Sequence, residues 1–234
     1  MFYVKLMMNL FTVLPQPNIT IGTLIINEPM CMLTNVIIAM VALVAYLQFN
    51  KLDNSNNYLH YWKLFFVTSP VAMLFAAFAH GFKWAFTPAE FKYVWLTMNV
   101  LGIVPTFFAT QASLSFGLNN KIITPLVYTV FVVVAMLTII YNNFTFVKIA
   151  ATVGALIILY THIVLYNTIK FAPAKLVIAG MLVAVGAIVV HSLKLSIHTW
   201  FNFKDLSHVL MAISCWVMFK GVNIYTSPNI IPQK

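Results

Sequence analysis

Charged residues are scarce in this chain of 234 residues, of which they make up 7%. A typical soluble domain carries roughly 25% charged residues. Arginine is absent, only four residues are acidic, and 62% of the chain is hydrophobic. Because so few polar side chains cannot cover a globular surface in water, the composition excludes a soluble protein and predicts an integral membrane protein.

The thirteen basic residues are all lysines and give the chain a net charge of +9. Lysines of membrane proteins usually lie at helix ends, where they contact anionic lipid head groups. We therefore expect the lipid bilayer as the partner of these charges, and no nucleic acid. The lysines divide almost evenly between the two predicted faces, so the positive-inside rule leaves the orientation open.

Cysteine is also rare, since Cys31 and Cys215 are its only examples, and both fall within apolar runs. They are expected to be buried small hydrophobic residues, not a disulfide framework or a metal-binding pair. The start of the chain lacks the small-residue cleavage site of a signal peptide. We interpret residues 1–27 as an N-terminal segment at the membrane interface, with a short extended piece over residues 18–26.

Seven apolar runs follow, at lengths that suit helices crossing the ~30 Å hydrocarbon core of a bilayer. Polar turns rich in Asn, Lys and Pro separate them. The sequence therefore predicts an all-α membrane protein, with a seven-transmembrane helix bundle over residues 28–225 and a short tail over 226–234. Seven crossings place the two termini on opposite faces. The expected spans are 30–49, 58–81, 91–116, 122–141, 147–166, 176–190 and 206–222.

Ionisable residues gather at one end of these spans. Because successive helices alternate in direction, three of the four acids and four of the six histidines fall at the face of the N-terminus. Polar residues also collect at the wet ends of helices without any function, so a functional cluster and an ordinary interface remain two alternatives. The residues at this face are Glu28, His80, Glu90, His191, His198, Asp205 and His208.

Asp205 and His208 open the seventh span and lie three residues apart, so on a helix they are neighbours one turn apart. A carboxylate beside an apolar run is costly in lipid, which favours a functional role for it. His80 ends the second span at the same face. Imidazoles and carboxylates that face one another in a dry bundle suit zinc, which lowers the pKa of a bound water to about 7.

Residues 28–35, EPMCMLTN, resemble a known first-helix pattern. In this pattern a glutamate is followed after six residues by an asparagine, and a hydroxyl residue directly precedes the asparagine. That pattern belongs to alkaline ceramidases. His80 matches the histidine that ends their second helix, and His208 matches the second histidine of the HxxxH motif that opens their seventh. On these residues the chain resembles the heptahelical membrane proteins that include alkaline ceramidases and adiponectin-receptor-type proteins.

The resemblance implies seven helices and a zinc site made from one histidine of the second helix and two of the seventh. A serine and an aspartate would assist there while water attacks a lipid amide. The chain departs from this pattern at three positions. Lys204 replaces the first HxxxH histidine, Ala76 replaces the serine, and Glu90 matches the acid of the third helix only loosely.

A protonated lysine cannot bind zinc, so Lys204 leaves the implied zinc site one ligand short. Asp205, the next residue, is the substitute ligand that we expect if a metal binds. The implied metal ligands are then His80, Asp205 and His208. The implied proton carriers are Glu28 and Glu90.

Lys204 has two possible arrangements at this site. Its side chain extends to the head groups while Asp205 binds the metal, or its ammonium replaces the metal by pairing with Glu28, Glu90 or Asp205. We favour the second arrangement, because it satisfies a buried acid without any cofactor.

Two functions therefore remain open. The function we favour is a non-catalytic accessory subunit of a membrane complex, located in the cytoplasmic membrane of a bacterium and retaining a polar pocket. The alternative is a zinc-dependent membrane hydrolase of a lipid amide or ester. A retinal protein with Lys220 as Schiff base is excluded, because the third span carries no mid-membrane acid to serve as counter-ion.

Overall fold

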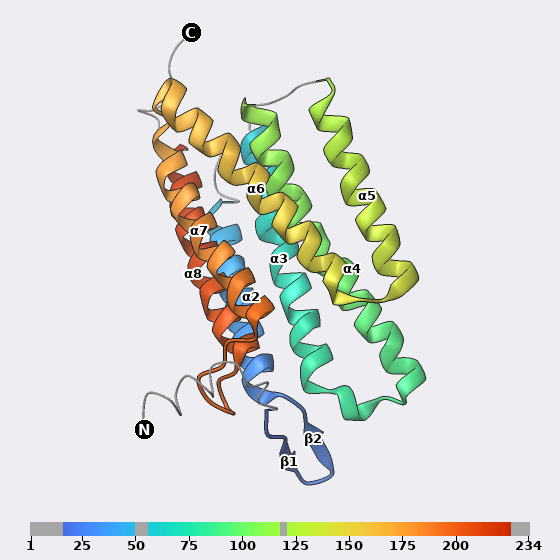
Figure 1. Ribbon diagram of the computed structural model, residues 1–234. Coiled ribbons are helices and arrows are strands. Elements are labelled where there is room, and N and C mark those ends of the chain that lie inside the picture. Colours follow the sequence, from blue (N-terminus) through green and yellow to red (C-terminus); the bar gives the residue numbers. More distant parts are fainter. Residues whose placement is uncertain (1–15, 50–55, 118–120, 226–234) are drawn as a thin grey trace, which may run out of the picture.

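Seven long helices form a bundle in the computed structural model, which describes residues 16–49, 56–117 and 121–225 (Figure 1). A short 3-10 helix, η1 (Lys83–Ala85), joins the second and third of them. Residues 1–15 of the expected interfacial segment and the expected tail at 226–234 lie outside the described residues. The seven helices are α2 (Pro29–Phe49), α3 (Asn57–Gly81), α4 (Pro88–Gly117), α5 (Ile123–Tyr141), α6 (Phe144–Ile169), α7 (Ala172–Leu193) and α8 (Phe203–Tyr225).

All seven helices are long and apolar enough to cross a membrane. The shortest, α5, has 19 residues and so rises about 28 Å. Its outward side chains are apolar, with Leu126 60% and Ile140 67% exposed, as a lipid-facing surface requires. The predicted all-α, seven-helix fold is thereby confirmed.

The helices are longer than the predicted spans at several ends. The seventh span was expected from residue 206, whereas α8 begins at Phe203, and the sixth was expected from residue 176, whereas α7 begins at Ala172. The added residues include polar and charged ones, which lower the mean hydropathy of the sequence segment around them although they continue the helix. The first turn of α8 therefore contains Lys204 and Asp205.

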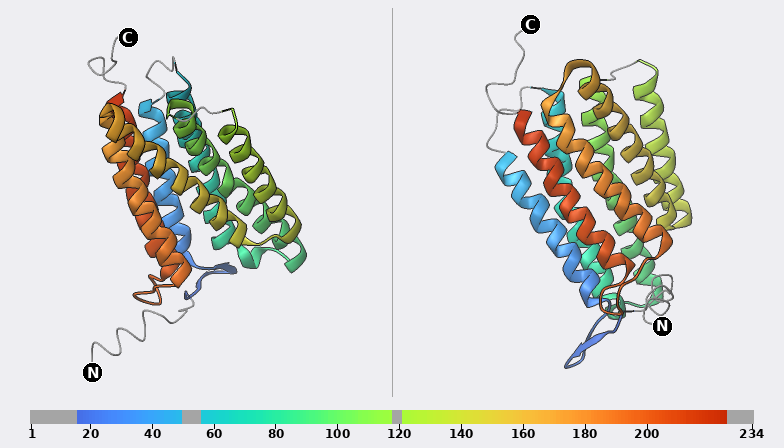
Figure 2. Two further views of the ribbon diagram at one scale, coloured as in Figure 1. Left: turned by 45° about the horizontal axis from the view of Figure 1, so that its top comes forward. Right: turned by 60° about the vertical axis from the view of Figure 1, so that its left-hand side comes forward.

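Six of the helices form a closed circuit. Helix α2 packs against α3 and α8, α3 against α4, α4 against α6, α6 against α7, and α7 against α8. Helix α5 packs on the outside of this circuit against α4 and α6 (Figures 1 and 2). The core inside the circuit is rich in aromatic rings, and Trp62, Phe66 and Phe219 are fully buried in it.

Two glycines allow α7 and α8 to approach each other closely. A Cβ on Gly180 would lie 3.0 Å from the backbone oxygen of Ser214, and one on Gly221 would lie 3.0 Å from the backbone oxygen of Pro173. Small residues at helix contacts are typical of membrane bundles, where close packing drives association. These contacts hold the middle and the end of α8 against α7.

A β-hairpin precedes the bundle, in the stretch where a short extended piece was expected. Strand β1 (Ile19–Ile21) pairs antiparallel with β2 (Leu24–Ile26), and Gly22 adopts a positive φ of 62° in the turn. The hairpin projects from the end of the bundle where α2 and α8 begin (Figure 1). It therefore lies at the same end as the expected polar cluster.

Candidate functional site

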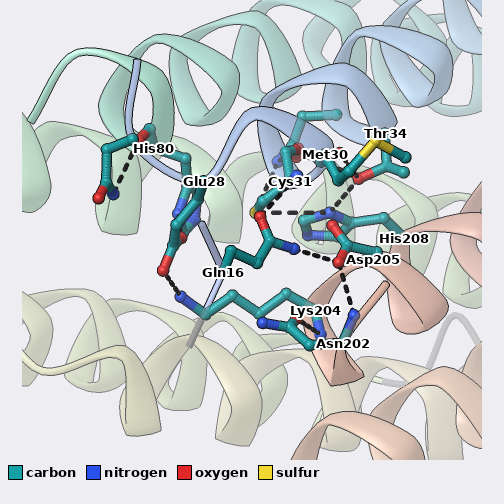
Figure 3. Close-up of polar contacts among 12 residues, drawn as sticks. Gln16, Glu28, Met30, Cys31, Thr34, His80, Asn202, Lys204, Asp205 and His208 are labelled. Atoms are coloured by element: carbon teal, nitrogen blue, oxygen red, sulfur yellow. Dashed lines mark hydrogen bonds and ion pairs between the residues drawn. The ribbon is translucent and has the colours of Figure 1, made fainter. Parts of the chain in front are cut away.

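Four helix ends meet next to the hairpin: the beginnings of α2, α4 and α8 and the end of α3. Glu28 lies immediately before α2, His80 is in the last turn of α3, and Lys204 and Asp205 are in the first turn of α8. These polar side chains are drawn together in Figure 3. The alternation of helix direction therefore places Glu28, His80, Lys204 and Asp205 at the same end of the bundle.

Glu28 is the centre of the first group of contacts. Its Oε2 accepts a hydrogen bond from His80 Nδ1 at 2.6 Å, and its Oε1 accepts one from Lys204 Nζ at 2.5 Å (Figure 3). Glu28 has a positive φ of 45°, a left-handed conformation that costs a residue with a side chain roughly 1–2 kcal/mol. These contacts join three helix ends through one carboxylate and offset that cost.

The charge state of Glu28 follows from these partners. Burial alone would raise the pKa of its carboxyl, but the hydrogen bond and charge of His80, together with Lys204, outweigh burial and lower the pKa from 4.5 to about 2. Glu28 is therefore ionised at neutral pH. The ammonium of Lys204 lies against it, which is the second of the two arrangements considered for this lysine.

Asp205 belongs to a second group, which caps α8. Its Oδ2 accepts a hydrogen bond from the backbone N–H of Asn202 at 2.8 Å, and Asn202 Oδ1 accepts one from the backbone N–H of Lys204 at 2.9 Å. This reciprocal pattern resembles a capping box, in which two residues satisfy free N–H groups at a helix start. Gln16 Nε2 also donates to Asp205 Oδ2. Asp205 thus has a structural role at this position.

His208 lies one turn further into α8 and contacts α2. Its Nδ1 is 3.0 Å from Thr34 Oγ1 and 3.9 Å from Cys31 Sγ. Gln16 links this group to the capping group, because its Oε1 accepts a hydrogen bond from the backbone N–H of Cys31 at 3.3 Å. The contacts of His208 are therefore with α2 and not with the carboxylate of Glu28.

Glu90 lies apart from these groups. Its carboxylate accepts hydrogen bonds from the backbone N–H of Thr87 at 2.9 Å and from Thr87 Oγ1 at 2.8 Å, on the exposed first turn of α4. The structure gives it the role of a helix-capping residue. Of the two expected proton carriers, Glu28 lies in the site, and the contacts of Glu90 do not join it to the other candidates.

One group of metal-ligating residue types is close enough to share an ion among the described residues. It consists of Glu28, Cys31 and His80, whose ligand atoms all lie within 4.8 Å of one another. The ligand atoms of the expected set, His80, Asp205 and His208, do not form such a close group. As arranged, the close group does not fit zinc, because both oxygens of Glu28 are already engaged and an ammonium lies beside them.

Several residues of the site were not identified from the sequence. Cys31 was interpreted as a simple buried hydrophobic residue, and Gln16 was within a segment assigned only to the interface. Asn202 could have been found, since a capping residue followed three positions later by an acid is a readable signal for a helix start. Gln16 gave no such signal, because its contacts depend on where the hairpin folds.

A cavity of about 390 Å³ opens beside Glu28. Its walls come from the beginnings of α2, α4 and α8, the end of α3, η1 and the turn between α5 and α6. The residues lining it are Asn27, Glu28, Ala79, His80, Lys83, Pro88, Phe91, Lys92, Trp95, Asn142 and Lys204. Neither Asp205 nor His208 is among them.

Comparison with known protein families gives a match over most of the chain. A family model described as a family of unknown function, DUF6962, matches residues 30–227, which includes all seven helices from the second residue of α2 onwards. No curated protein matches the chain, and no solved structure does.

Proposed function

We propose that this chain, which belongs to the family of unknown function DUF6962, is a non-catalytic membrane subunit whose polar pocket is held together by an ion-pair cluster in place of a metal. The observation that carries this proposal is the position of Lys204, whose Nζ lies 2.5 Å from Glu28 Oε1. The cluster is completed by His80 on the second oxygen of the same carboxylate. We expect it to act as an accessory subunit of a membrane complex.

Electrostatics support a pocket without a metal. A dication about 4 Å from an ammonium is repelled by about 8 kcal/mol at an effective dielectric constant of about 20. Lys204 is only 24% exposed and is held by Glu28, so its charge stays beside the carboxylate. The other expected ligands have structural contacts of their own, since Asp205 caps α8 and His208 contacts α2.

The zinc content of the purified protein tests the proposal. We expect no stoichiometric zinc in wild-type protein purified without chelators and analysed by elemental mass spectrometry. Lys204→His should gain zinc, because the substitution removes the repelling charge and adds an imidazole beside Glu28 and His80. Lys92→His, which changes another lysine of the same cavity, is the matched control and should gain none. Stoichiometric zinc in the wild type that is lost in His80→Ala would overturn the proposal.

A second candidate is a zinc-dependent hydrolase of a lipid amide or ester, the activity implied by the resemblance to alkaline ceramidases. The observation that favours it is the proximity of Glu28, Cys31 and His80. It requires Lys204 to move from Glu28 to the head groups, as long lysine side chains at helix ends can do. Zinc-dependent release of fatty acid from a labelled lipid amide, abolished by His80→Ala, would support this candidate over the first.

The cellular location we expect is the cytoplasmic membrane of a bacterium. The seven apolar helices support a membrane location, and the choice of organism and membrane remains a prediction. Fractionation of the native host, with detection of the chain in the membrane pellet, tests it.

A further inference from the structure

We propose that the cavity beside Glu28 binds a phosphate-bearing anion, the chemistry of an anionic phospholipid head group. Its volume of about 390 Å³ is in the range of ligand sites, which is about 300–1,000 Å³. It lies among helix ends, the level at which lipid head groups meet a transmembrane bundle. Basic pockets between transmembrane helices are known to bind anionic head groups.

The balance of charge in the cavity favours an anion. Three lysines line it, Lys83, Lys92 and Lys204, against a single acid, Glu28. The ion pair with Lys204 neutralises that acid. Among the described residues, both ion pairs involve Glu28, so neither Lys83 nor Lys92 has a carboxylate partner. Lys83 Nζ lies 5.4 Å from the centroid of the Trp84 ring, a contact that does not neutralise its charge. Two lysines of the cavity lining therefore carry positive charges that no carboxylate balances.

The walls that carry these lysines are held in place by hydrogen bonds. Asn142, in a left-handed conformation at the end of α5, donates from Nδ2 to the backbone oxygen of Lys92 at 2.9 Å and accepts from Asn99 at 3.1 Å. Asn27 donates from its backbone N–H to the oxygen of Gly81 at 2.8 Å. The backbone around the cavity is thus fixed before a ligand arrives, which lowers the entropic cost of binding.

An apolar wall completes the cavity and suits the beginning of a lipid's acyl chains. Trp95 packs edge-on against His80, with ring centroids 5.5 Å apart, and Phe91 packs against Trp95 at 5.9 Å. Aromatic side chains of this kind are enriched at the level of the head groups. Lysine is a common phosphate ligand because its ammonium is a compact charge with three donors. A charged head group with an apolar continuation matches both parts of the cavity.

The inference rests on the proposed function in one respect: the pocket must contain the Lys204–Glu28 pair and not a metal. Zinc bound in the cavity would compete for the same acid and would itself attract phosphate. The zinc content of each preparation is therefore measured beside its lipid binding, so that the failure of one proposal is separated from the failure of the other.

The test is native mass spectrometry of the purified protein in detergent with phosphatidylglycerol, with phosphatidylcholine as the zwitterionic lipid. A double variant, Lys83→Gln with Lys92→Gln, removes the two charges that have no carboxylate partner. The matched control, Lys170→Gln with Lys175→Gln, removes two lysines that pack over Tyr166 at the opposite end of the bundle. Glycerol phosphate is added as a competitor in a separate arm to distinguish a lipid from a water-soluble source.

We expect phosphatidylglycerol to bind more tightly than phosphatidylcholine to the wild type. A basic residue near an anionic lipid contributes about 1 kcal/mol, a factor of about five in affinity, so the double variant should bind phosphatidylglycerol about 25-fold more weakly. The control pair should bind it as the wild type does. Displacement by glycerol phosphate would support the site and assign it to a water-soluble anion. Equal binding of the two lipids, or an unchanged double variant, would overturn the inference whatever the zinc content.

Discussion

Acidification is expected to destabilise the wild-type protein more than a Glu28→Gln variant. Burial opposes the charge on Glu28, but His80 and Lys204 outweigh it, so that the pKa of the folded state is about 2 in place of 4.5. A group whose folded pKa is lowered stabilises the fold fully above its unfolded pKa and loses that contribution as the pH falls through the folded pKa. The loss should therefore occur between about pH 4.5 and pH 2.

The size of the effect follows from the same two values. One pKa unit corresponds to about 1.36 kcal/mol, so the difference between 4.5 and about 2 corresponds to about 3 kcal/mol of unfolding free energy. The side chain of Glu28 is only 20% exposed, so screening by solvent and salt reduces this figure little. Glutamine has nearly the same volume and can still accept a hydrogen bond, but it carries no charge.

The assay compares apparent melting temperatures in detergent, followed by tryptophan fluorescence at a series of pH values between about 6 and 2.5. The wild type should be more stable than Glu28→Gln near neutral pH, and the difference should shrink as the pH falls through the window. Other titrating groups are common to both proteins and cancel in the difference. Glu90→Gln is the comparison: hydrogen bonds from Thr87 also lower the pKa of this exposed carboxyl, but solvent screening should make its effect smaller than that of Glu28→Gln. Parallel curves for the wild type and Glu28→Gln would refute the reasoning.

Two further predictions concern helix packing and capping. Gly221→Ala should lower the melting temperature and destabilise the fold by about 1–3 kcal/mol, because the new Cβ would meet the backbone of Pro173 and Val177 at 3.0 Å. Gly186→Ala is the control and should not destabilise the fold, because a Cβ there would have no atom within 4 Å. Asn202→Ala should lower the unfolding free energy by about 1 kcal/mol, because a helix cap is lost, and should lower the melting temperature accordingly. An unchanged melting temperature would contradict the capping role.

The fold could be predicted from the sequence because the signal for a membrane helix is long and simple. Each span is a run of apolar residues, and the bilayer fixes its length. The ends were less predictable, as α8 shows by beginning at Phe203 with a lysine and an acid in its first turn. Hydropathy reports where a segment is apolar, whereas a helix end is decided by hydrogen bonds such as those of Asn202 and Asp205.

The candidate site could be predicted only as a collection of residues at one face. Alternating helix direction places Glu28, His80 and Asp205 at the same end, but it does not decide which side chains touch. That choice depends on the left-handed backbone at Glu28 and on the path of the hairpin, which puts Gln16 against Asp205. Neither feature has a local sequence signal. The roles of these residues in binding or chemistry remain predictions.

A single carboxylate connects polar residues from three helix ends at this end of the apolar bundle. Glu28 connects the start of α2 to the end of α3 through His80 and to the start of α8 through Lys204. A carboxylate that is only 20% exposed would be costly without a partner, and so would an ammonium on a side chain that is 24% exposed. Each is tolerated because the other is present, so the two residues are expected to be retained or lost together. A metal ion would cross-link the same helices through the same carboxylate. Under the proposed function, the ammonium at position 204 therefore takes the place of a metal at this site.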